Sequence, residues 1–291
     1  MRIIVTGGAG FIGGYIVNKL IKDNHEVIVI DDLSSGKKEN VNPKAKFYKL
    51  DVTEMDVRGK CSMFSDIDIV FHLAAFPRVE PSIKEPIHAH NINVNGTLNI
   101  LKACVDYNVK RFIFTSSSAV YHKVNPMSPY ALHKLIGEQY CKLFSKLYNI
   151  ETACLRYSNA YGEGQPTEGA YCNVMGIFEQ QKAKGKKLTI VGDGEQRRDF
   201  VHVRDIVDAN IKCMDYPLEL NGDVFNIGYG KNYSVNQIAK WIGGETTNVE
   251  PRIEPRETLL NSEKALNVLN WEAKMDLENW KNTYGLDLES Y

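Results

Sequence analysis

The sequence predicts an α/β fold in which a doubly wound parallel sheet is followed by a smaller, mixed α/β lobe. Short β-branched runs, typical of strands buried on both faces, alternate with stretches of helical spacing over the first 115 residues. After Arg156 the pattern changes, because a loop with several glycines (162–169) is followed by short elements of both kinds. These two observations predict a large sheet and a second lobe, with a ligand cleft between them.

The expected elements follow one another in the order strand, helix, strand, which favours parallel pairing with right-handed crossovers. The strands are expected at 3–5, 27–30, 67–71, 112–114 and 152–156. The helices are expected at 11–22, 87–107, 128–148 and 173–184. We place the boundary between the lobes at 158/159, so that the domains are 1–158 and 159–291, with a strand near 224–227 returning to the large sheet.

Composition excludes several classes of partner. The chain has 291 residues, with 35 Lys and Arg against 36 Asp and Glu. This net charge of −1 provides no electrostatic surface for nucleic acid or an anionic membrane. No apolar run approaches the roughly 18 residues of a membrane span, the N-terminus lacks a signal sequence, and the six cysteines form no Cys-x-x-Cys pair. We therefore expect a soluble cytoplasmic protein with reduced thiols.

A glycine-rich turn between the first strand and the first helix indicates a dinucleotide site. Gly7 and Gly10 permit a tight turn and close approach to a pyrophosphate, and Gly13 lets the helix pack on the strand. Asp31 ends the second strand, 18 residues after Gly13, where a carboxylate accepts hydrogen bonds from ribose hydroxyls. Since residues 32–36 contain no arginine for a 2′-phosphate, the sequence favours NAD over NADP.

A second pattern indicates acid/base chemistry. Tyr130 and Lys134 are four residues apart, on one face of an expected helix. A free phenol has a pKa of about 10, and a neighbouring ammonium ion favours the phenolate. The hydroxyl cluster 115–118 follows a buried strand, so it emerges at the edge where open α/β sheets bind their ligands.

Nine motifs together resemble those of one family. In chain order they are TGGAGFIG, DDLSSG, HLAA, NVNGT, SSSAVY, SPYALHK, LRYSNAYG, GDGEQRRDF and FNIG. They are similar to those of extended short-chain dehydrogenase/reductases, specifically the NAD-dependent nucleotide-sugar epimerase and dehydratase group. The resemblance implies a Rossmann-type NAD-binding domain and a C-terminal lobe that binds the nucleotide sugar. It also implies a homodimer joined by a four-helix bundle of the two long helices.

The resemblance assigns roles to particular residues. Ser117 would hydrogen-bond the reacting sugar oxygen, Tyr130 would be the acid/base, and Lys134 would hold the nicotinamide ribose. With the turn residues above, the cofactor residues are Gly7, Gly10, Phe11, Ile12, Gly13, Asp31, Asp32, Ser35, Gly36, Asp51, Val52, Leu73, Ala74, Ala75, Asn93, Tyr130 and Lys134. The substrate residues are Ser117, Ser118, Asn159, Arg198, Arg252, Glu254 and Thr258. Instead of binding substrate, Arg198 could form an ion pair with Asp199. We expect no metal, since His88 and His90 have no evident third ligand.

The same comparison narrows the reaction. Dehydratases of the family carry an Asp-Glu pair after the catalytic hydroxyl, and Ser118 and Ala119 stand there instead, which disfavours dehydration. The favoured reaction is 4-epimerisation of UDP-glucose and UDP-galactose through a transient 4-keto sugar. A small residue at Thr258 would also admit UDP-GlcNAc and UDP-GalNAc. A decarboxylase that binds a uronate through Arg78, a net dehydrogenase, and a non-catalytic NAD sensor remain alternatives.

Two departures concern the sugar site. Only 12 residues separate Ser117 from Tyr130, which predicts a shortened loop over the sugar. His122 also stands where the family motif has glycine. Both changes bear on which sugar is accepted.

Overall fold

The computed structural model describes the chain except residues 55–61, 78, 121–127, 169–171, 252–253 and 285–291. Seven of the described strands form one parallel sheet in the order β10-β6-β5-β4-β1-β2-β3. They are β1 (Arg2–Thr6), β2 (Glu26–Asp31), β3 (Lys46–Lys49), β4 (Ile69–His72), β5 (Arg111–Ser117), β6 (Glu151–Tyr157) and β10 (Asp223–Ile227). The strand order reverses between β1 and β4, which is where open α/β sheets bind ligands.

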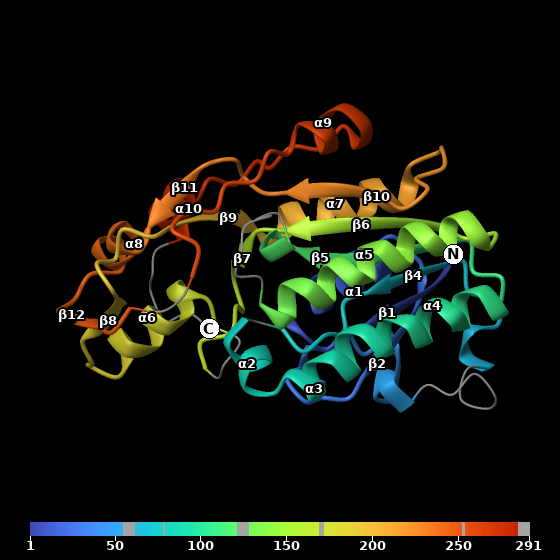
Figure 1. Ribbon diagram of the computed structural model, residues 1–291, viewed down its shortest axis with the longest axis horizontal. Coiled ribbons are helices and arrows are strands. Elements are labelled where there is room, and N and C mark those ends of the chain that lie inside the picture. Colours follow the sequence, from blue (N-terminus) through green and yellow to red (C-terminus); the bar gives the residue numbers. More distant parts are fainter. Residues whose placement is uncertain (55–61, 78, 121–127, 169–171, 252–253, 285–291) are drawn as a thin grey trace.

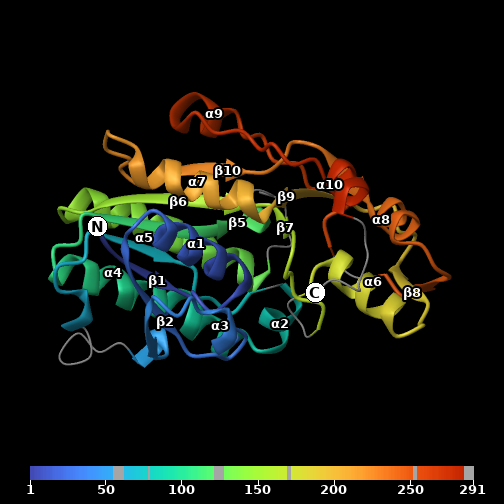
Figure 2. The ribbon, with the colours of Figure 1, turned by 180° about the vertical axis from the view of Figure 1, so that it is seen from behind.

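Helices cover both faces of this sheet, as Figures 1 and 2 show from opposite sides. α1 (Phe11–Lys22) and α7 (Val203–Asp215) pack on one face, and α4 (Thr97–Asp106) and α5 (Pro129–Leu147) on the other. The alternation along β1 explains the two cores, because Ile3 faces the α1 side and Ile4 faces the α4 side. The predicted doubly wound parallel sheet is confirmed.

Helical residues run without a break from 86 to 106. α3 (Pro86–His90) passes into a π-helical turn, η4 (Asn91–Gly96), and then into α4. A short helix, α2 (Val79–Lys84), precedes them, and 3₁₀ turns lie at η1 (Lys38–Asn40), η2 (Val52–Glu54), η3 (Ser62–Phe64) and η5 (Ser118–Val120). The π-helical turn lies at the pocket end of the sheet, where such turns are frequently functional.

The smaller lobe occupies the other end of the molecule (Figure 1). It contains a three-stranded sheet in the order β11-β9-β7 and a parallel pair, β12-β8. Its strands are β7 (Asn159–Tyr161), β8 (Leu188–Val191), β9 (Arg197–His202), β11 (Asn232–Ser234) and β12 (Thr246–Val249). Its helices are α6 (Val174–Ala183), α8 (Val235–Ile242) and α10 (Leu277–Tyr284). Tyr161, Phe178, Phe200 and Trp280 are at its core.

The segment after the first lobe contributes one strand and two helices to the large domain. The strand expected near 224–227 is β10, which pairs in parallel with β6. α7 packs against α1, and α9 (Glu263–Leu269) lies on β10. The indole of Trp271 is fully buried and donates to the carbonyl oxygen of Asp205 in α7. The polypeptide therefore crosses between the two lobes several times.

Two further expectations concern the chain as a whole. No helix among the described residues is long and apolar enough to cross a membrane. Five described cysteines, at 104, 141, 154, 172 and 213, are buried free thiols. In the large sheet, β3 was not expected, because its sequence, KFYK, has only two apolar residues and both are only partly buried.

Candidate active site

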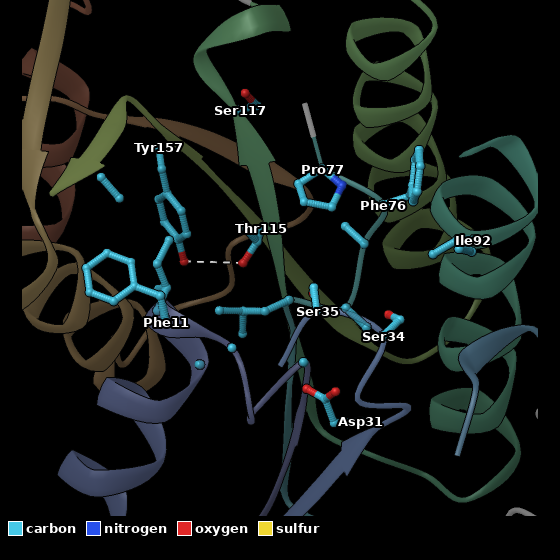
Figure 3. Close-up of a pocket in the computed structure, with 18 of the residues that line it drawn as sticks. Phe11, Asp31, Ser34, Ser35, Phe76, Pro77, Ile92, Thr115, Ser117 and Tyr157 are labelled. Atoms are coloured by element: carbon cyan, nitrogen blue, oxygen red, sulfur yellow. Dashed lines mark hydrogen bonds between the residues drawn. The ribbon is translucent and has the colours of Figure 1, made fainter. Parts of the chain in front are cut away.

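A cavity of about 440 Å³ opens at the carboxyl ends of the strands, beside the point where their order reverses. Its walls come from the glycine turn, the ends of β2, β4 and β5, the start of α5, and the segment that enters the smaller lobe. Figure 3 shows Asp31 at one end of this cavity and Ser117 at the other. The cavity therefore joins the predicted cofactor and catalytic residues.

The glycine turn is packed too tightly against neighbouring backbone to admit a side chain at Gly7 or Gly13. Gly7 has a φ of +70°, and a Cβ there would lie 2.7 Å from the amide nitrogen of Ala74. A Cβ on Gly13 would lie 2.1 Å from the carbonyl oxygen of Gly7. Gly10 caps α1 without a side-chain hydrogen bond, so the first amide groups of the helix face the cavity with Phe11 and Ile12. This cradle fits the pyrophosphate of a dinucleotide.

Asp31 is held at the tip of β2 by backbone groups. Its Oδ2 accepts from the amide of Ala9 at 3.0 Å, and its Oδ1 from that of Leu33 at 2.9 Å. Burial raises the pKa of this carboxyl, and the two hydrogen bonds favour its ionised form. Each carboxylate oxygen keeps a further lone pair, which suits ribose hydroxyls.

The other predicted cofactor residues divide into two groups. Those that line the cavity are Gly7, Gly10, Phe11, Ile12, Gly13, Asp31, Asp32, Ser35, Asp51, Val52, Leu73, Ala74 and Ala75. Gly36 and Asn93 lie behind this wall. A Cβ on Gly36 would lie 2.9 Å from Ala9, and the Asn93 amide pairs with both backbone groups of Phe76, which itself lines the cavity.

A buried chain of hydrogen bonds, which sequence analysis missed, supports this wall. The hydroxyl of Thr97 donates to the carbonyl oxygen of Asn93 at 2.8 Å, so it accepts from Nε2 of His72 at 3.0 Å. Nδ1 of His72 then accepts from the hydroxyl of Thr6 at 2.8 Å. Burial lowers the pKa of His72 to about 3, which keeps the imidazole neutral. A histidine ending an otherwise apolar strand was the available signal.

Ser117, Tyr130 and Lys134 all line the cavity. α5 begins where it does because the Ser128 side chain accepts from the amide of Ala131 and Pro129 occupies the first helical position. Tyr130 and Lys134 then lie on one face of the helix, opposite the end of β5. The helix and strand therefore bring together the three predicted catalytic residues.

Lys134 is almost completely buried. Its Nζ donates to the carbonyl oxygen of Thr115 at 2.7 Å and lies 4.9 Å from the centre of the Phe114 ring. Burial lowers the pKa of Lys134 to about 8, and the charge of Glu138 opposes that change. The ammonium ion is thus fixed beside the strand that ends in Ser117.

Among the described residues, two phenols line the cavity, and the structure distinguishes them. The hydroxyl of Tyr157 lies 3.3 Å from that of Thr115 (Figure 3) and 2.7 Å from Nδ2 of Asn210. Burial raises the pKa of Tyr157 to about 12, so this phenol stays neutral. Tyr130, which is placed by the hydrogen bond from its backbone amide to Ser82 Oγ, therefore remains the candidate for the general base.

The predicted substrate residues lie in two places. Ser117, Ser118 and Asn159 line the cavity, and the Asn159 amide donates to the carbonyl oxygen of Asp199 at 2.9 Å. The amide of Ala119 donates to Ser117 Oγ, which leaves the hydroxyl proton of Ser117 free to donate. The sequence-based expectations for Arg78, Arg252, His122 and the shortened loop fall outside the described residues.

Arg198 belongs to β9, Glu254 and Thr258 lie beside that strand, and none of the three lines the cavity. Arg198 pairs with Glu254 at 2.5 Å, rather than with Asp199. The Asp199 carboxylate instead accepts from the amides of Tyr229, Gly230 and Leu260. Thr258 is buried and pairs with β9 through its backbone, since its amide donates to the carbonyl oxygen of Arg197.

A model of the NAD dependent epimerase/dehydratase family matches residues 3–228. The chain belongs to this family. It is 41% identical to a putative UDP-glucose 4-epimerase of Methanocaldococcus jannaschii over 294 aligned residues, which cover 95% of this chain and 94% of the relative.

Two solved structures are similar over nearly the whole chain. One is a UDP-glucose 4-epimerase of Thermotoga maritima with UDP-glucose (TM-score 0.90, 37% identity), and the match covers 96% of this chain and 95% of the other. The second is a UDP-N-acetylglucosamine 4-epimerase of Methanobrevibacter ruminantium in complex with UDP-N-acetylmuramic acid (TM-score 0.87, 32% identity). That match covers 98% of this chain and 95% of the other. The resemblance found in the sequence motifs is confirmed.

Proposed function

We propose that this family member is an NAD-dependent isomerase that epimerises UDP-sugars at C4, interconverting UDP-glucose and UDP-galactose through a transient 4-keto sugar. The observation that carries the proposal is the convergence of Ser117, Tyr130 and Lys134 on the cavity that begins at the glycine turn. The relatives and solved structures described above, which carry the names of UDP-sugar 4-epimerases, support the same reaction.

The cofactor-binding wall described above would hold NAD, with its pyrophosphate at the turn and a ribose at Asp31. NAD bound there would supply reversible hydride transfer at C4 of the sugar. Tyr130 removes the proton of the 4-hydroxyl and later restores it. Lys134, as an ammonium ion, favours the phenolate of Tyr130, and Ser117 donates a hydrogen bond to the reacting oxygen.

The charges around the cavity favour a neutral sugar over a uronate. Among the described lining residues, Asp31, Asp32, Asp51 and Glu168 are acidic. Lys134 is the basic side chain besides His88, and its Nζ is already bonded to Thr115. Besides Lys134 and His88, the described lining residues offer a sugar carboxylate no basic partner, which favours epimerisation of a neutral hexose over decarboxylation of a uronic acid.

For the nucleotide end of the substrate, we assign Asn159, Arg198, Arg252 and Glu254. Asn159 belongs to the cavity, and Arg198 and Glu254 form an ion pair next to it in the fold.

We assign the binding of NAD to residues 1–158, together with the returning strand, and the binding of the nucleotide sugar to residues 159–291. The family resemblance puts a small residue, Thr258, at the position that admits an N-acetyl group, so we propose UDP-GlcNAc and UDP-GalNAc as further substrates, although this side chain is buried outside the cavity wall.

The same proposal includes a homodimer in the cytoplasm. Apolar side chains are exposed along α5, at Leu132, Leu143 and Leu147, and on the neighbouring helices at Ile83 and Ile87. Helices α2, α3, α4 and α5 lie together on one face of the sheet (Figure 1). Two copies of this face would bury the exposed leucines in a four-helix bundle of α4 and α5 from each subunit.

The experiment that tests the function is proton NMR of UDP-glucose and UDP-GlcNAc with purified protein and catalytic NAD. We expect new galacto-configured anomeric signals without consumption of NAD. Thr258→Tyr should lose the conversion of UDP-GlcNAc and keep that of UDP-glucose, whereas Thr258→Ser should keep both. Unchanged spectra of both sugars would contradict the proposal, and release of CO₂ from UDP-glucuronic acid would favour the decarboxylase.

A further inference from the structure

A buried carboxylate that has no part in the reaction above lies one helical turn beyond Lys134. Glu138 is 2% exposed and follows Lys134 by one turn of α5, on the same side of the helix. Its Oε1 accepts from Ser116 Oγ at 2.5 Å and from Nε of Arg156 at 2.7 Å. Its Oε2 accepts from Nη2 of Arg156 at 2.6 Å. One carboxylate thus joins α5, β5 and β6.

The position of these bonds is as informative as their number. Ser116 and Arg156 are direct register partners on β5 and β6. Ser116 lies between Thr115, whose carbonyl oxygen binds Lys134 Nζ, and Ser117 of the catalytic group. Glu138 therefore fastens the helix that carries Tyr130 to the strand end that carries Ser117.

The charge of Glu138 also acts on Lys134, which is buried away from water. Besides Tyr130, the described titratable groups near Lys134 are His72 on β4, Cys154 on β6 and Cys141 on α5. Burial lowers the pKa of His72 and raises that of Cys154, so both are neutral near pH 7. Among the described residues, Glu138 is therefore the carboxylate whose charge stabilises the ammonium ion.

We propose that Glu138 is a positioning residue, which keeps Lys134 charged and fixes the end of β5 through Ser116. The proposal rests on the proposed function, because the ammonium ion acts on the sugar through Tyr130. It has a consequence for Arg156, which shares the carboxylate with Lys134. Removing Glu138 leaves two cations without their anion, whereas removing Arg156 leaves the whole negative charge to Lys134.

A matched control lies on the same two strands. Arg111 and Glu151 form another ion pair, at the first register position of β5 and β6. It is five residues from the Ser116–Arg156 position, or about 16 Å along the strands. Glu151→Gln therefore removes an Arg–Glu pair from the same strands without touching the surroundings of Lys134.

The first measurement needs no activity. Urea midpoints of wild type, Glu138→Gln and Glu151→Gln are compared at pH 7 and pH 10 in the presence of a reductant. Lys134, with its pKa lowered to about 8, is neutral at pH 10. Glu138→Gln should unfold at a lower urea concentration than wild type, and this difference should be smaller at pH 10 than at pH 7. At pH 10 Lys134 is neutral, so the loss of its attraction to Glu138 no longer lowers stability. The deficit of Glu151→Gln should stay the same, since Arg111 remains charged.

The second measurement is the pH profile of kcat/KM for UDP-glucose. Glu138→Gln should move the alkaline limb down by about 1 pH unit. Arg156→Gln should move it up, and Glu151→Gln should leave it in place. If Glu138→Gln fails to fold, Arg156→Gln still tests the proposal. The lowering of its urea midpoint relative to wild type should be larger at pH 10 than at pH 7.

The outcomes separate the two proposals. A pH-independent deficit of Glu138→Gln, together with an unmoved alkaline limb, would overturn the role of Glu138. A wild-type protein that epimerises no UDP-sugar would overturn the proposed function, while the urea comparison would still decide the charge coupling between Glu138 and Lys134.

Discussion

Nδ1 of His72 accepts a hydrogen bond of 2.8 Å from the hydroxyl of Thr6, which joins the carboxyl ends of β4 and β1. The same hydroxyl oxygen accepts from the amides of Leu73 and Ala74, both at 3.2 Å. One threonine thus uses its hydroxyl proton and its lone pairs to hold together the ends of β1 and β4, between which the strand order reverses. The glycine turn starts at the residue after Thr6.

Replacing Thr6 with valine should destabilise the protein by about 1–3 kcal/mol, since it leaves buried polar groups unpaired at nearly constant volume. Urea unfolding at pH 7 measures this, and NAD affinity should fall with it. Thr247→Val on β12, where the side chain is exposed, provides the control and should stay within about 0.5 kcal/mol. Equal effects of the two substitutions would contradict the role of Thr6.

Neighbouring glycines of α1 make a sharper test of the cofactor turn. A Cβ on Gly13 would lie 2.1 Å from the carbonyl oxygen of Gly7, whereas a Cβ on Gly14 finds its nearest neighbour at 3.5 Å. Gly13→Ala should cost about 1–3 kcal/mol and reduce NAD affinity, as measured by urea unfolding and calorimetry. Gly14→Ala should bind NAD normally and gain about 0.5–1 kcal/mol from helix propensity. If Gly13→Ala binds NAD as tightly as Gly14→Ala, the turn does not hold the pyrophosphate.

The two phenols of the cavity should differ in kinetics. Tyr130→Phe removes the general base and should lower kcat about 10²–10⁴-fold, measured with UDP-glucose. Tyr157→Phe removes a hydroxyl that Thr115 and Asn210 bind, so it should affect stability more than kcat. A larger loss of kcat in Tyr157→Phe than in Tyr130→Phe would reverse the assignment.

Asp199 should make stability fall with rising pH. Burial raises its pKa to about 6, above the value of 3.8 expected in the unfolded chain, so the folded state binds the proton more tightly. Between these values the unfolded state ionises first, and wild type loses stability as pH rises. Relative to Asp199→Asn, which does not titrate, wild type should lose about 2 kcal/mol from pH 4 to pH 7, measured by urea unfolding. A constant difference would contradict this assignment.

The apolar face of α5 should set the oligomeric state. Leu143 and Leu147 are 45% and 59% exposed in one chain. Wild type should sediment as the proposed dimer, and changing both leucines to glutamate should give monomers of 32.9 kDa in sedimentation velocity. Leu218→Glu changes a leucine that is 64% exposed, away from this face, and should leave the dimer intact. Dimers of the double variant would place the interface elsewhere.

Local patterns were sufficient to predict much of the large sheet and its cavity. The first helix has the predicted bounds, Phe11–Lys22, because glycine precedes it and a single apolar face runs through it. The glycine turn and Asp31 were visible because both the residue types and their spacing are fixed by the shape of a dinucleotide. β3 was missed because an edge strand that is partly exposed needs few apolar residues.

What sequence reasoning missed depends on contacts between distant segments. Glu138 follows Lys134 at a spacing visible in the sequence, but its partners Ser116 and Arg156 come together only through the register of β5 and β6. The Thr6–His72–Thr97 chain likewise joins three elements that are far apart in the sequence. Periodicity reports which face of an element is buried, and it carries no information on which buried polar groups meet.

The position of β10 at the edge of the sheet has a consequence for synthesis on the ribosome. Seventy residues separate the end of β6, at Tyr157, from the end of β10, at Ile227. During translation of that interval, at about 5–20 residues per second, the outer edge of β6 has no strand to pair with for roughly 4–14 s. An unpaired strand edge readily pairs with other chains. The nascent chain is therefore most prone to aggregate during this interval, when chaperones that shield the edge would have their largest effect on yield.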